Sequence, residues 1–231
     1  MSLLVCENVS KRYGNVMALN SINLNIFERR IIGLLGPNGS GKTTLIKLIT
    51  GLLTPTSGRI TINGKVPGIE SKAVVSYLPD TTYLSEWMKI SDIIAYFSDF
   101  YRDFEPDKAA EMLAKLNINP AVKLKTLSKG TKEKVQLIMV MSRNAQLYIL
   151  DEPIAGVDPA ARDYILDTIL TNYRPEATII LSTHLISDVE KILDDVIFLK
   201  NGNIALYGSR NDIVSHEGKT IDQLFREVFR C

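Results

Sequence analysis

A glycine-rich segment between two apolar stretches is the part of the sequence whose residue types and spacing could do chemistry most directly. Residues 36–43 fit the pattern G-x-x-x-x-G-K-[ST], in which bare backbone amides and the amino end of a following helix surround a polyphosphate. Lys42 would reach the β- and γ-phosphates, and the hydroxyl of Thr43 would ligate Mg²⁺. A glycine-rich turn matches this pattern by chance in only about 1% of chains of this length. The residues predicted to bind the nucleotide are Gly36, Pro37, Asn38, Gly39, Ser40, Gly41, Lys42, Thr43 and Thr44.

Two adjacent carboxylates, Asp151 and Glu152, directly follow the apolar run 147–150. In a parallel sheet the carboxyl ends of the strands face the ligand crevice, where a phosphate-binding loop also emerges. Asp151 is therefore placed to hold Mg²⁺ through its water shell, and Glu152 to orient or deprotonate the water that attacks the γ-phosphate. An Asp-Glu pair by itself is more often the start of a solvated loop, and the phosphate-binding pattern upstream favours the site.

The elements that must position these residues alternate between strands and helices. Residues 31–35 predict a buried strand, and residues 43–49 predict a helix that stops near Gly51. Further strands are predicted at 147–150, 178–181 and 196–199, with a helix at 159–173 between the first two. This alternation is typical of an α/β fold with a parallel sheet.

The other segments predict additions to this sheet. Residues 2–32 predict short strands with turns at 13–15 and 28–30, and residues 58–63 predict another strand. The block 83–144 has helical periodicity and predicts a helical insertion, with helices at 90–101, 107–116 and 128–143. Residues 211–231 predict a short amphipathic helical tail.

Composition excludes several classes of function. The 231 residues contain 27 Lys and Arg against 26 Asp and Glu, and the net charge of +1 argues against a general affinity for nucleic acid or anionic lipid. The two cysteines and two histidines lack the spacing of a zinc site or a disulfide framework, which fits a reducing cytosol. No run of 18 apolar residues and no signal peptide is found, so we expect that the chain does not span a membrane by itself.

The order of the motifs resembles that of the ATP-binding subunit of an ABC transporter over essentially the whole chain. Tyr13 stands where that family has the aromatic residue that stacks on adenine, and residues 77–80 stand where it has its glutamine loop. Residues 127–131 stand at its LSGGQ signature, residues 155–159 resemble its D-loop, and His184 resembles its switch histidine. Within that family the chain most resembles the ATPases that are paired with ABC-2-type permeases, and transporters of this type are mainly exporters.

The resemblance implies a fold and a division of the chain. The fold is an α/β, RecA-like P-loop NTPase core with an antiparallel β subdomain and an inserted α-helical subdomain. Residues 1–231 would form a single ATP-binding domain, whose core and β subdomain comprise 1–82 and 145–210. The signature subdomain would comprise residues 83–144, and the helical tail residues 211–231.

The resemblance also implies a mechanism. In the family two subunits pack head to tail, and each ATP lies between the phosphate loop of one and the signature helix of the other. Ser128 and the backbone amide of Gly130 would bind the γ-phosphate in trans, Asp158 would couple the two sites, and His184 would contact the γ-phosphate. Considered alone, Ser128 is explained by helix capping and His184 by a satisfied histidine of the core.

Two departures from the family pattern affect the expected activity. Asp80 replaces the glutamine, and Lys129 and Thr131 replace a glycine and the glutamine of the signature. A carboxylate at position 80 can serve a cation, but it adds negative charge beside the phosphoryl group, which would slow turnover or alter coupling. We nevertheless expect a competent ATPase, because Glu152 and His184 are present. The catalytic set is predicted to be Glu152, His184, Lys42 and Asp80, and the Mg²⁺ set Thr43, Asp80 and Asp151.

The implied partners are a second ATP-binding subunit, identical or different, and an integral-membrane permease. The segment 83–87 after Asp80 would contact the permease, although ordinary core packing explains its aromatic residues equally well. The chain would then lie in the cytoplasm, on the inner face of the membrane, and energise transport, with no nucleic-acid partner. The alternatives are a soluble ABC ATPase without a permease and an ATP-gated regulatory dimer with negligible turnover.

Overall fold

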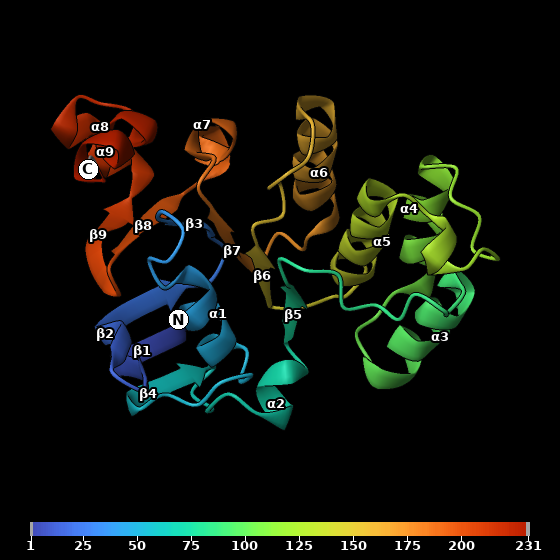
Figure 1. Ribbon diagram of the computed structural model, residues 1–231, viewed down its shortest axis with the longest axis horizontal. Coiled ribbons are helices and arrows are strands. Elements are labelled where there is room, and N and C mark those ends of the chain that lie inside the picture. Colours follow the sequence, from blue (N-terminus) through green and yellow to red (C-terminus); the bar gives the residue numbers. More distant parts are fainter. Residues whose placement is uncertain (1, 230–231) are drawn as a thin grey trace.

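A six-stranded sheet runs through the middle of the computed structural model, which describes residues 2–229 (Figure 1). The strand order is β5-β6-β7-β3-β8-β9; the first five strands are parallel, and β9 runs antiparallel to β8. This order confirms the predicted parallel α/β sheet. The strands are β3 (Ile31–Leu35), β5 (Val75–Leu78), β6 (Leu147–Asp151), β7 (Thr178–Thr183), β8 (Asp195–Lys200) and β9 (Asn203–Ser209).

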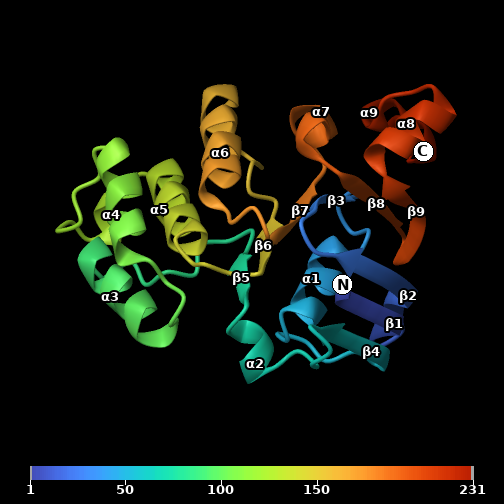
Figure 2. The ribbon, with the colours of Figure 1, turned by 180° about the vertical axis from the view of Figure 1, so that it is seen from behind.

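The central strands are apolar along their whole length because both faces of the sheet are covered. On β6, Leu147 and Ile149 belong to one core, and Tyr148 and Leu150 belong to the other. The first core lies between the sheet, helix α1 (Lys42–Ile49) and a second, smaller sheet. The second core lies on the other face of the sheet, under the helices of residues 90–141 and the helices that follow β6 (Figures 1 and 2).

The smaller sheet is antiparallel, with the order β2-β1-β4, and contains β1 (Ser2–Tyr13), β2 (Val16–Phe27) and β4 (Ser57–Ile62). The short strands predicted for residues 2–32 are instead two strands of 12 residues each, and the predicted turns lie where they end. Irregularities in the register interrupt the β1–β2 ladder, and Asn8 has a positive φ of 49° at one of them. Bulges of this kind break the alternation of apolar residues, which makes one long strand resemble several short ones in the sequence.

Three helices form an excursion from the main sheet. They are α3 (Ile90–Phe100), α4 (Pro106–Lys115) and α5 (Lys129–Met141), and each lies within two residues of its predicted bounds. Because β5 and β6 are neighbours in the sheet, the chain between them leaves the sheet and returns beside the point of departure. Strand β5 and the short helix α2 (Ile69–Lys72) were not predicted, since four-residue elements carry too little periodicity.

Arg143 fastens this excursion to the main sheet from a buried position. Its guanidinium donates hydrogen bonds to the carbonyl oxygen of Val75 at 2.6 Å and to both carboxylate oxygens of Asp103 at 3.0 Å. It also lies 3.9 Å from the centre of the Tyr101 ring. A buried guanidinium needs this number of partners, because an unpaired charge in the interior is strongly destabilising. The helices and β5 therefore hold one another in place.

Helix α6 (Pro159–Asn172) connects β6 to β7, and the short helix α7 (Ile186–Val189) follows β7. The predicted single helical tail is two helices, α8 (Arg210–Glu217) and α9 (Ile221–Val228), which meet at Gly218 with φ 65°. Glu190 holds the amino end of α9 through a hydrogen bond from the amide of Ile221 at 2.8 Å. Residues 230–231 of the predicted tail lie outside the described residues. Among the described helices, none is long and apolar enough to cross a bilayer.

Candidate functional site

The glycine-rich loop joins β3 to α1, as the sequence predicts, and its glycines are required by close contacts. A Cβ atom on Gly36 would lie 2.5 Å from the carbonyl oxygen of Leu199 and 2.5 Å from Ser40 Oγ. Gly41 has a φ of 110°, and its Cβ would lie 2.8 Å from the carbonyl oxygen of Ala18. Any side chain at either position would displace the loop, so the loop keeps its shape only with glycine there.

A cavity of about 440 Å³ opens beside this loop. Val16 and Met17 of β2 and the turn residues Asn201 and Gly202 line it from other parts of the chain. Pro37 is exposed and does not line the cavity, whereas Ser40 is buried and its Oγ has no hydrogen-bond partner. The loop and first-turn residues that line the cavity are Asn38, Gly39, Gly41, Lys42, Thr43 and Thr44.

Lys42 is a buried cation that is held by the loop itself. Its Nζ donates hydrogen bonds to the carbonyl oxygens of Gly36 at 2.7 Å and Pro37 at 3.3 Å. The same atom lies 3.3 Å from Oε1 of Glu152, close enough for an ion pair but without the geometry of a hydrogen bond. The ammonium group is thus fixed at the floor of the cavity.

Asp151 ends β6 in a fully buried position, and Ser182 of the neighbouring strand β7 lies beside it in register. Ser182 Oγ donates to Asp151 Oδ1 at 2.5 Å, while Oδ2 of Asp151 has no partner. Burial raises the pKa of Asp151 above its ordinary value, the hydroxyls of Ser182 and Thr43 oppose the rise, and Asp80 and Glu152 add to it. A buried carboxylate oxygen without a partner is suited to receive a cation or its water shell.

Glu152 joins Lys42 and His184 into one chain of contacts. Its Oε1 faces Lys42, and its Oε2 lies 3.0 Å from Nδ1 of His184. The Glu152 backbone has a positive φ of 51°, and its amide donates to the carbonyl and to the hydroxyl of Ser182 at 3.1 and 3.0 Å. His184 follows β7 and is 42% exposed, so it does not belong to the core.

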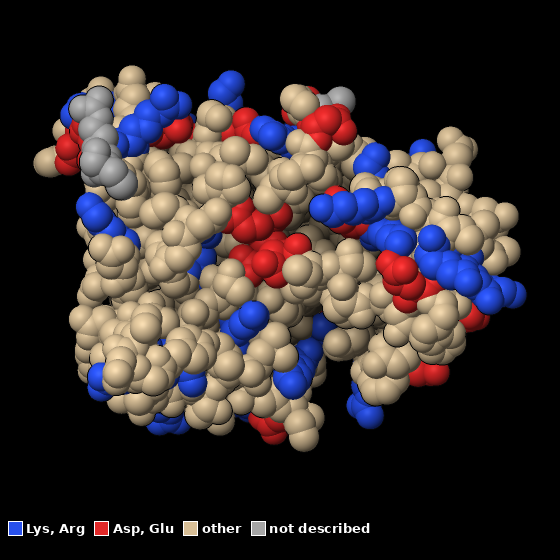
Figure 3. Space-filling model, in the orientation of Figure 1, with Lys and Arg blue, Asp and Glu red and all other residues tan. Residues whose placement is uncertain are grey.

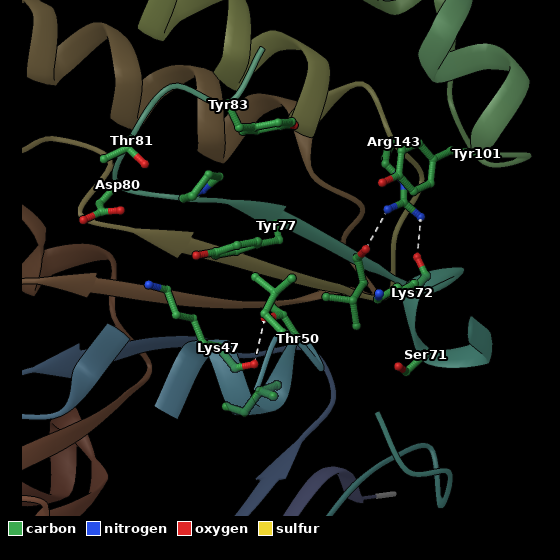
Figure 4. Close-up of a pocket in the computed structure, with 14 residues that line it drawn as sticks. Lys47, Thr50, Ser71, Lys72, Tyr77, Asp80, Thr81, Tyr83, Tyr101 and Arg143 are labelled. Atoms are coloured by element: carbon green, nitrogen blue, oxygen red, sulfur yellow. Dashed lines mark hydrogen bonds between the residues drawn. The ribbon is translucent and has the colours of Figure 1, made fainter. Parts of the chain in front are cut away.

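Asp80 follows the end of β5 and is exposed. It lines the cavity at the phosphate loop, and it also lines a groove of about 450 Å³ on its other side (Figure 4). The buried side chain of Gln136 on α5 holds this loop, since its Nε2 donates to the carbonyl of Thr81 at 3.3 Å and its Oε1 accepts from the amide of Tyr83 at 3.1 Å. The position of Asp80 therefore depends on α5.

The carboxyl ends of four neighbouring strands supply this site. Asp80 follows β5, the pair 151–152 ends β6, His184 follows β7, and the phosphate loop follows β3. This is the edge of a parallel sheet at which ligands bind. Figure 3 shows acidic side chains gathered in the middle of this face, beside the hollow that separates the half containing α1 from the helices α3–α5.

Ser128, Gly130 and Asp158 lie together in a different cavity, of about 420 Å³, which shares no lining residue with the phosphate-loop cavity. Ser128 caps α5 by accepting a hydrogen bond from the amide of Thr131 at 3.2 Å, and Asp158 caps α6 through the amide of Ala161 at 3.0 Å. Both residues thus have a local role in the isolated chain, and both face solvent.

Tyr13 does not line the phosphate-loop cavity, although its cross-strand neighbour Val16 does. Its ring is 46% exposed at the end of the β1–β2 hairpin, with Lys11 Nζ 5.3 Å from its centre. Sequence reasoning missed Val16 and Met17, which are 66% and 47% exposed. The signal available in the sequence was two apolar residues directly after the turn predicted at 13–15.

The groove on the far side of Asp80 lies between α1, β5 and the start of the helical excursion. In Figure 4, Tyr77 crosses the groove, Asp80 and Lys47 lie toward one end, and Arg143 and Tyr101 lie at the other. Burial raises the pKa of the Tyr77 hydroxyl far above its ordinary value, and Asp151 and Asp80 add to the effect. Tyr83 also lines the groove.

The arrangement fits Mg²⁺ that arrives with a triphosphate. Thr43 and Asp80 line the cavity, and the unpartnered oxygen of Asp151 is buried next to it. Within the described residues, however, no group of three or more His, Cys, Asp or Glu side chains converges closely enough to hold a metal ion. Phosphate oxygens would therefore have to supply part of the coordination.

The chain is similar to known proteins over most of its length. Residues 19–155 match the family model described as ABC transporter. An ABC transporter ATP-binding protein of Methanocaldococcus jannaschii is 34% identical over 212 residues, which are 90% of this chain and 78% of the relative. The linearmycin resistance ATP-binding protein of Bacillus subtilis is 30% identical over 231 residues, 96% of this chain and 74% of the relative.

Solved structures share the whole architecture. The structure of an ATP-binding subunit of an ABC transporter is 29% identical and has a TM-score of 0.89, over 99% of this chain and 100% of that one. A dimeric ATP-binding cassette in a post-hydrolysis state, bound to ADP and Pi, has the same fold. Its TM-score is 0.77 at 21% identity, over 89% of this chain and 98% of that one. The predicted P-loop NTPase fold is confirmed. The chain belongs to the ABC transporter family, as an ATP-binding ATPase domain of that family.

Proposed function

We propose that this chain hydrolyses ATP at the interface of a head-to-tail dimer and thereby drives transport through a separate membrane permease. The observation that carries the proposal is the separation of its two sets of polar residues. The phosphate loop, Asp151 and Glu152 form one site, whereas Ser128, Gly130 and Asp158 line another cavity. A second subunit turned head to tail would bring the second set of one chain over the first set of its partner.

The phosphate loop and Lys42 would bind the triphosphate. The amino end of α1 carries no acidic residue in its first turn, so its dipole and free amides attract an anion without competition. Lys42 already lies at the floor of the cavity, where phosphate oxygens can replace the two carbonyl oxygens and Glu152 as its partners. Val16 and Met17 would provide apolar contact for the base, beside Tyr13.

Glu152 would orient the attacking water and accept its proton. Its carboxylate is held between Lys42 and His184 in the apo protein, so binding of the triphosphate to Lys42 frees one oxygen for the water. His184 would keep the other oxygen in place and reach the γ-phosphate, because it is exposed and contacts Glu152, which lines the cavity. Catalysis of this kind is mainly positioning and electrostatic stabilisation.

Thr43, Asp80 and Asp151 would hold Mg²⁺, which neutralises charge that develops on the phosphoryl oxygens. From the partner subunit, Ser128 and the amide of Gly130 would contact the γ-phosphate, and Asp158 would couple the two sites. Their solvent-facing positions at the starts of α5 and α6 support this arrangement, since helix amino ends favour anions.

We propose that the groove beyond Asp80 receives a segment of the permease, at the cytoplasmic face of the membrane. Tyr83, which lines the groove, is 49% exposed, and Trp87, four residues further along the chain and outside the groove lining, is 70% exposed. This exposure favours docking over core packing for these two side chains, whereas Leu84 between them is buried. Export is the proposed direction, supported by the ABC-2-type resemblance and by the resistance function in the name of the Bacillus relative. The chain would act as one ATP-binding domain. Its parts would be the core with the β subdomain at 1–82 and 145–210, the signature subdomain at 83–144 and the helical tail at 211–231.

The test compares ATP binding and phosphate release by the wild type, Lys42→Ala and Glu152→Gln, with the permease supplied. We expect Lys42→Ala to lose ATP binding, and Glu152→Gln to bind ATP while releasing phosphate at least about 100-fold more slowly. The control is Glu111→Gln, an exposed position on α4. If the wild type releases phosphate no faster than Glu152→Gln, the protein is instead a regulatory dimer. The structural argument for that alternative is the carboxylate of Asp80, which adds negative charge beside the phosphoryl group.

A further inference from the structure

We propose that Asp80 makes a divalent cation a condition of nucleotide binding, so that this site accepts ATP as its metal complex and rejects the metal-free triphosphate. The inference rests on the proposed nucleotide site and adds the chemical form in which the nucleotide enters. It concerns the residue at which this chain has a carboxylate and the family pattern has a neutral amide.

The first argument is the balance of charge around the cavity. Two carboxylates, Asp80 and Glu152, line it together with a single cationic side chain, Lys42, among the residues that the structure describes. Lys42 is already paired with Glu152 at 3.3 Å, so Asp80 is the uncompensated charge of this pair of carboxylates. The buried carboxylate of Asp151, immediately behind Glu152, adds to the negative field. A metal-free polyphosphate would enter against this field.

The second argument is the position of Asp80 relative to the other carboxylates. A small pocket of about 40 Å³ connects it with Asp151, Glu152 and Glu133, all of which line that pocket. Within the described part of the chain Asp80 makes no ion pair. Lys47 lines the neighbouring groove together with Asp80, but its Nζ does not come within 4.0 Å of the Asp80 carboxylate oxygens. The charge of Asp80 therefore lies at the site without an ion-pair partner among the described residues.

The third argument is that these acidic groups do not form a metal site by themselves. Their side chains do not converge on a common point in the described structure, so the cation must bring or find phosphate oxygens as ligands. Metal and nucleotide then bind as a pair. By thermodynamic linkage, the factor by which Mg²⁺ strengthens ATP binding equals the factor by which ATP strengthens Mg²⁺ binding.

Asp80 can be neutralised without disturbing its loop. The loop is held by the side chain of Gln136 and by the strand β5, and the Asp80 carboxylate takes no part in these contacts. Asp80→Asn keeps the size of the side chain and removes only the charge. Asp99→Asn is the matched control, because Asp99 is an exposed aspartate on α3 outside every cavity described above.

The experiment measures the affinity of the isolated protein for a non-hydrolysable ATP analogue by calorimetry, once in EDTA and once in excess MgCl₂, at low ionic strength. We expect Asp80→Asn to strengthen metal-free binding about tenfold, the order of effect of one unit charge beside a polyphosphate at a partly exposed site. Binding of the magnesium complex should not strengthen, because the same substitution removes a proposed ligand of the cation, and Asp99→Asn should match the wild type in both conditions. High salt should reduce the gain of Asp80→Asn, which a purely steric role would not predict.

The outcomes separate this inference from the proposed function. If the wild type does not bind the magnesium complex, the nucleotide site itself is wrong. If the magnesium complex binds but Asp80→Asn leaves metal-free binding unchanged, the nucleotide site stands and the inference is overturned. Asp80→Gln, which introduces the family residue, serves as a second variant and should show the same gain as Asp80→Asn.

Discussion

Asp151, a proposed Mg²⁺ ligand, carries a cost in stability. It is fully buried at the end of β6, and only one of its two carboxylate oxygens has a hydrogen-bond partner. Burial raises its pKa, which means that the folded protein holds the proton of this group more tightly than the unfolded chain does. At neutral pH the ionised group therefore lowers the free energy of unfolding.

Asp151→Asn should stabilise the nucleotide-free protein while removing magnesium-dependent phosphate release. At pH 7 we expect a gain on the order of 1 kcal/mol, or about 2–4 °C in the melting temperature, because the buried charge is removed and the hydrogen bond from Ser182 remains possible. The gain should shrink as the pH falls through the raised pKa of Asp151, where the wild type becomes neutral too. Thermal melts of both proteins between about pH 4 and 8 measure this.

The same melts on Asp99→Asn provide the control, since that aspartate is exposed. A loss of stability in Asp151→Asn at pH 7 would contradict the prediction and would show that the carboxylate makes favourable contacts in the folded protein.

Glu152, the next residue, has a strained backbone, because its positive φ of 51° is unusual for a residue other than glycine. The two hydrogen bonds from its amide to Ser182 hold that conformation.

Helix α5 connects the two sides of the proposed mechanism. Its amino end carries Ser128 and Gly130, and its buried middle carries Gln136, which fixes the loop of Asp80. A displacement at either end would be carried along 13 helical residues. In the proposed dimer, the helix therefore links the phosphate site in trans to the groove beyond Asp80.

Gly130→Asp should prevent dimerisation without harming the fold or nucleotide binding by the monomer. A Cβ at this position meets no atom within 4 Å, so the substitution fits the isolated chain. In the proposed dimer it would place a carboxylate against the γ-phosphate, and we expect phosphate release to fall at least about 100-fold. Light scattering of the Glu152→Gln protein with ATP, with and without Gly130→Asp, measures the dimer.

Ala114→Asp on the exposed side of α4 introduces the same charge away from this cavity and should leave dimerisation unchanged. Persistence of the ATP-dependent dimer in the Gly130→Asp protein would argue that the cavity of Ser128 and Asp158 does not face the nucleotide.

At the scale of the whole molecule, the nucleotide cavity and the groove beyond it meet at Asp80. Both are lined by this residue, and the groove is closed at its far end by the buried Arg143, which joins β5 to the helical excursion (Figure 4). A partner seated in the groove would therefore contact the main sheet and the helices at once. This placement suits a surface that transmits a change at the nucleotide to a membrane subunit.

Trp87→Ala should weaken association with the permease and leave ATP binding unchanged. The side chain is 70% exposed, so its removal costs the fold little, whereas an exposed tryptophan buried at an interface commonly contributes about 2 kcal/mol, or roughly 30-fold in affinity. Co-purification of the two subunits at matched expression, with ATP affinity measured in parallel, tests it. Tyr96→Ala, at an exposed aromatic residue of α3 outside the segment 83–87, is the comparison, and equal recovery of the permease with Trp87→Ala and wild type would refute the docking role.

The sequence by itself determined the parts of this protein that depend on neighbours along the chain. The phosphate loop follows from glycine spacing between an apolar strand and a helix, and Asp151 and Glu152 follow from their place at the end of an apolar run. Helices α3, α4 and α5 follow from their apolar periodicity. In each case the local pattern carries the structural signal, because the hydrogen bonds or the buried face lie within the segment.

Only the tertiary structure decided which of these residues meet. Strand β5 is recognisable only by its pairing with β6, and the cavity walls at Val16, Met17 and Gly202 come from segments far apart in the sequence. The contacts of Gln136 with the Asp80 loop and the separation of Ser128 from the phosphate loop likewise depend on long-range packing. Such contacts are made between elements, whose relative positions are set by the order of strands in the sheet and by the cores that cover its two faces, and no local pattern specifies that order.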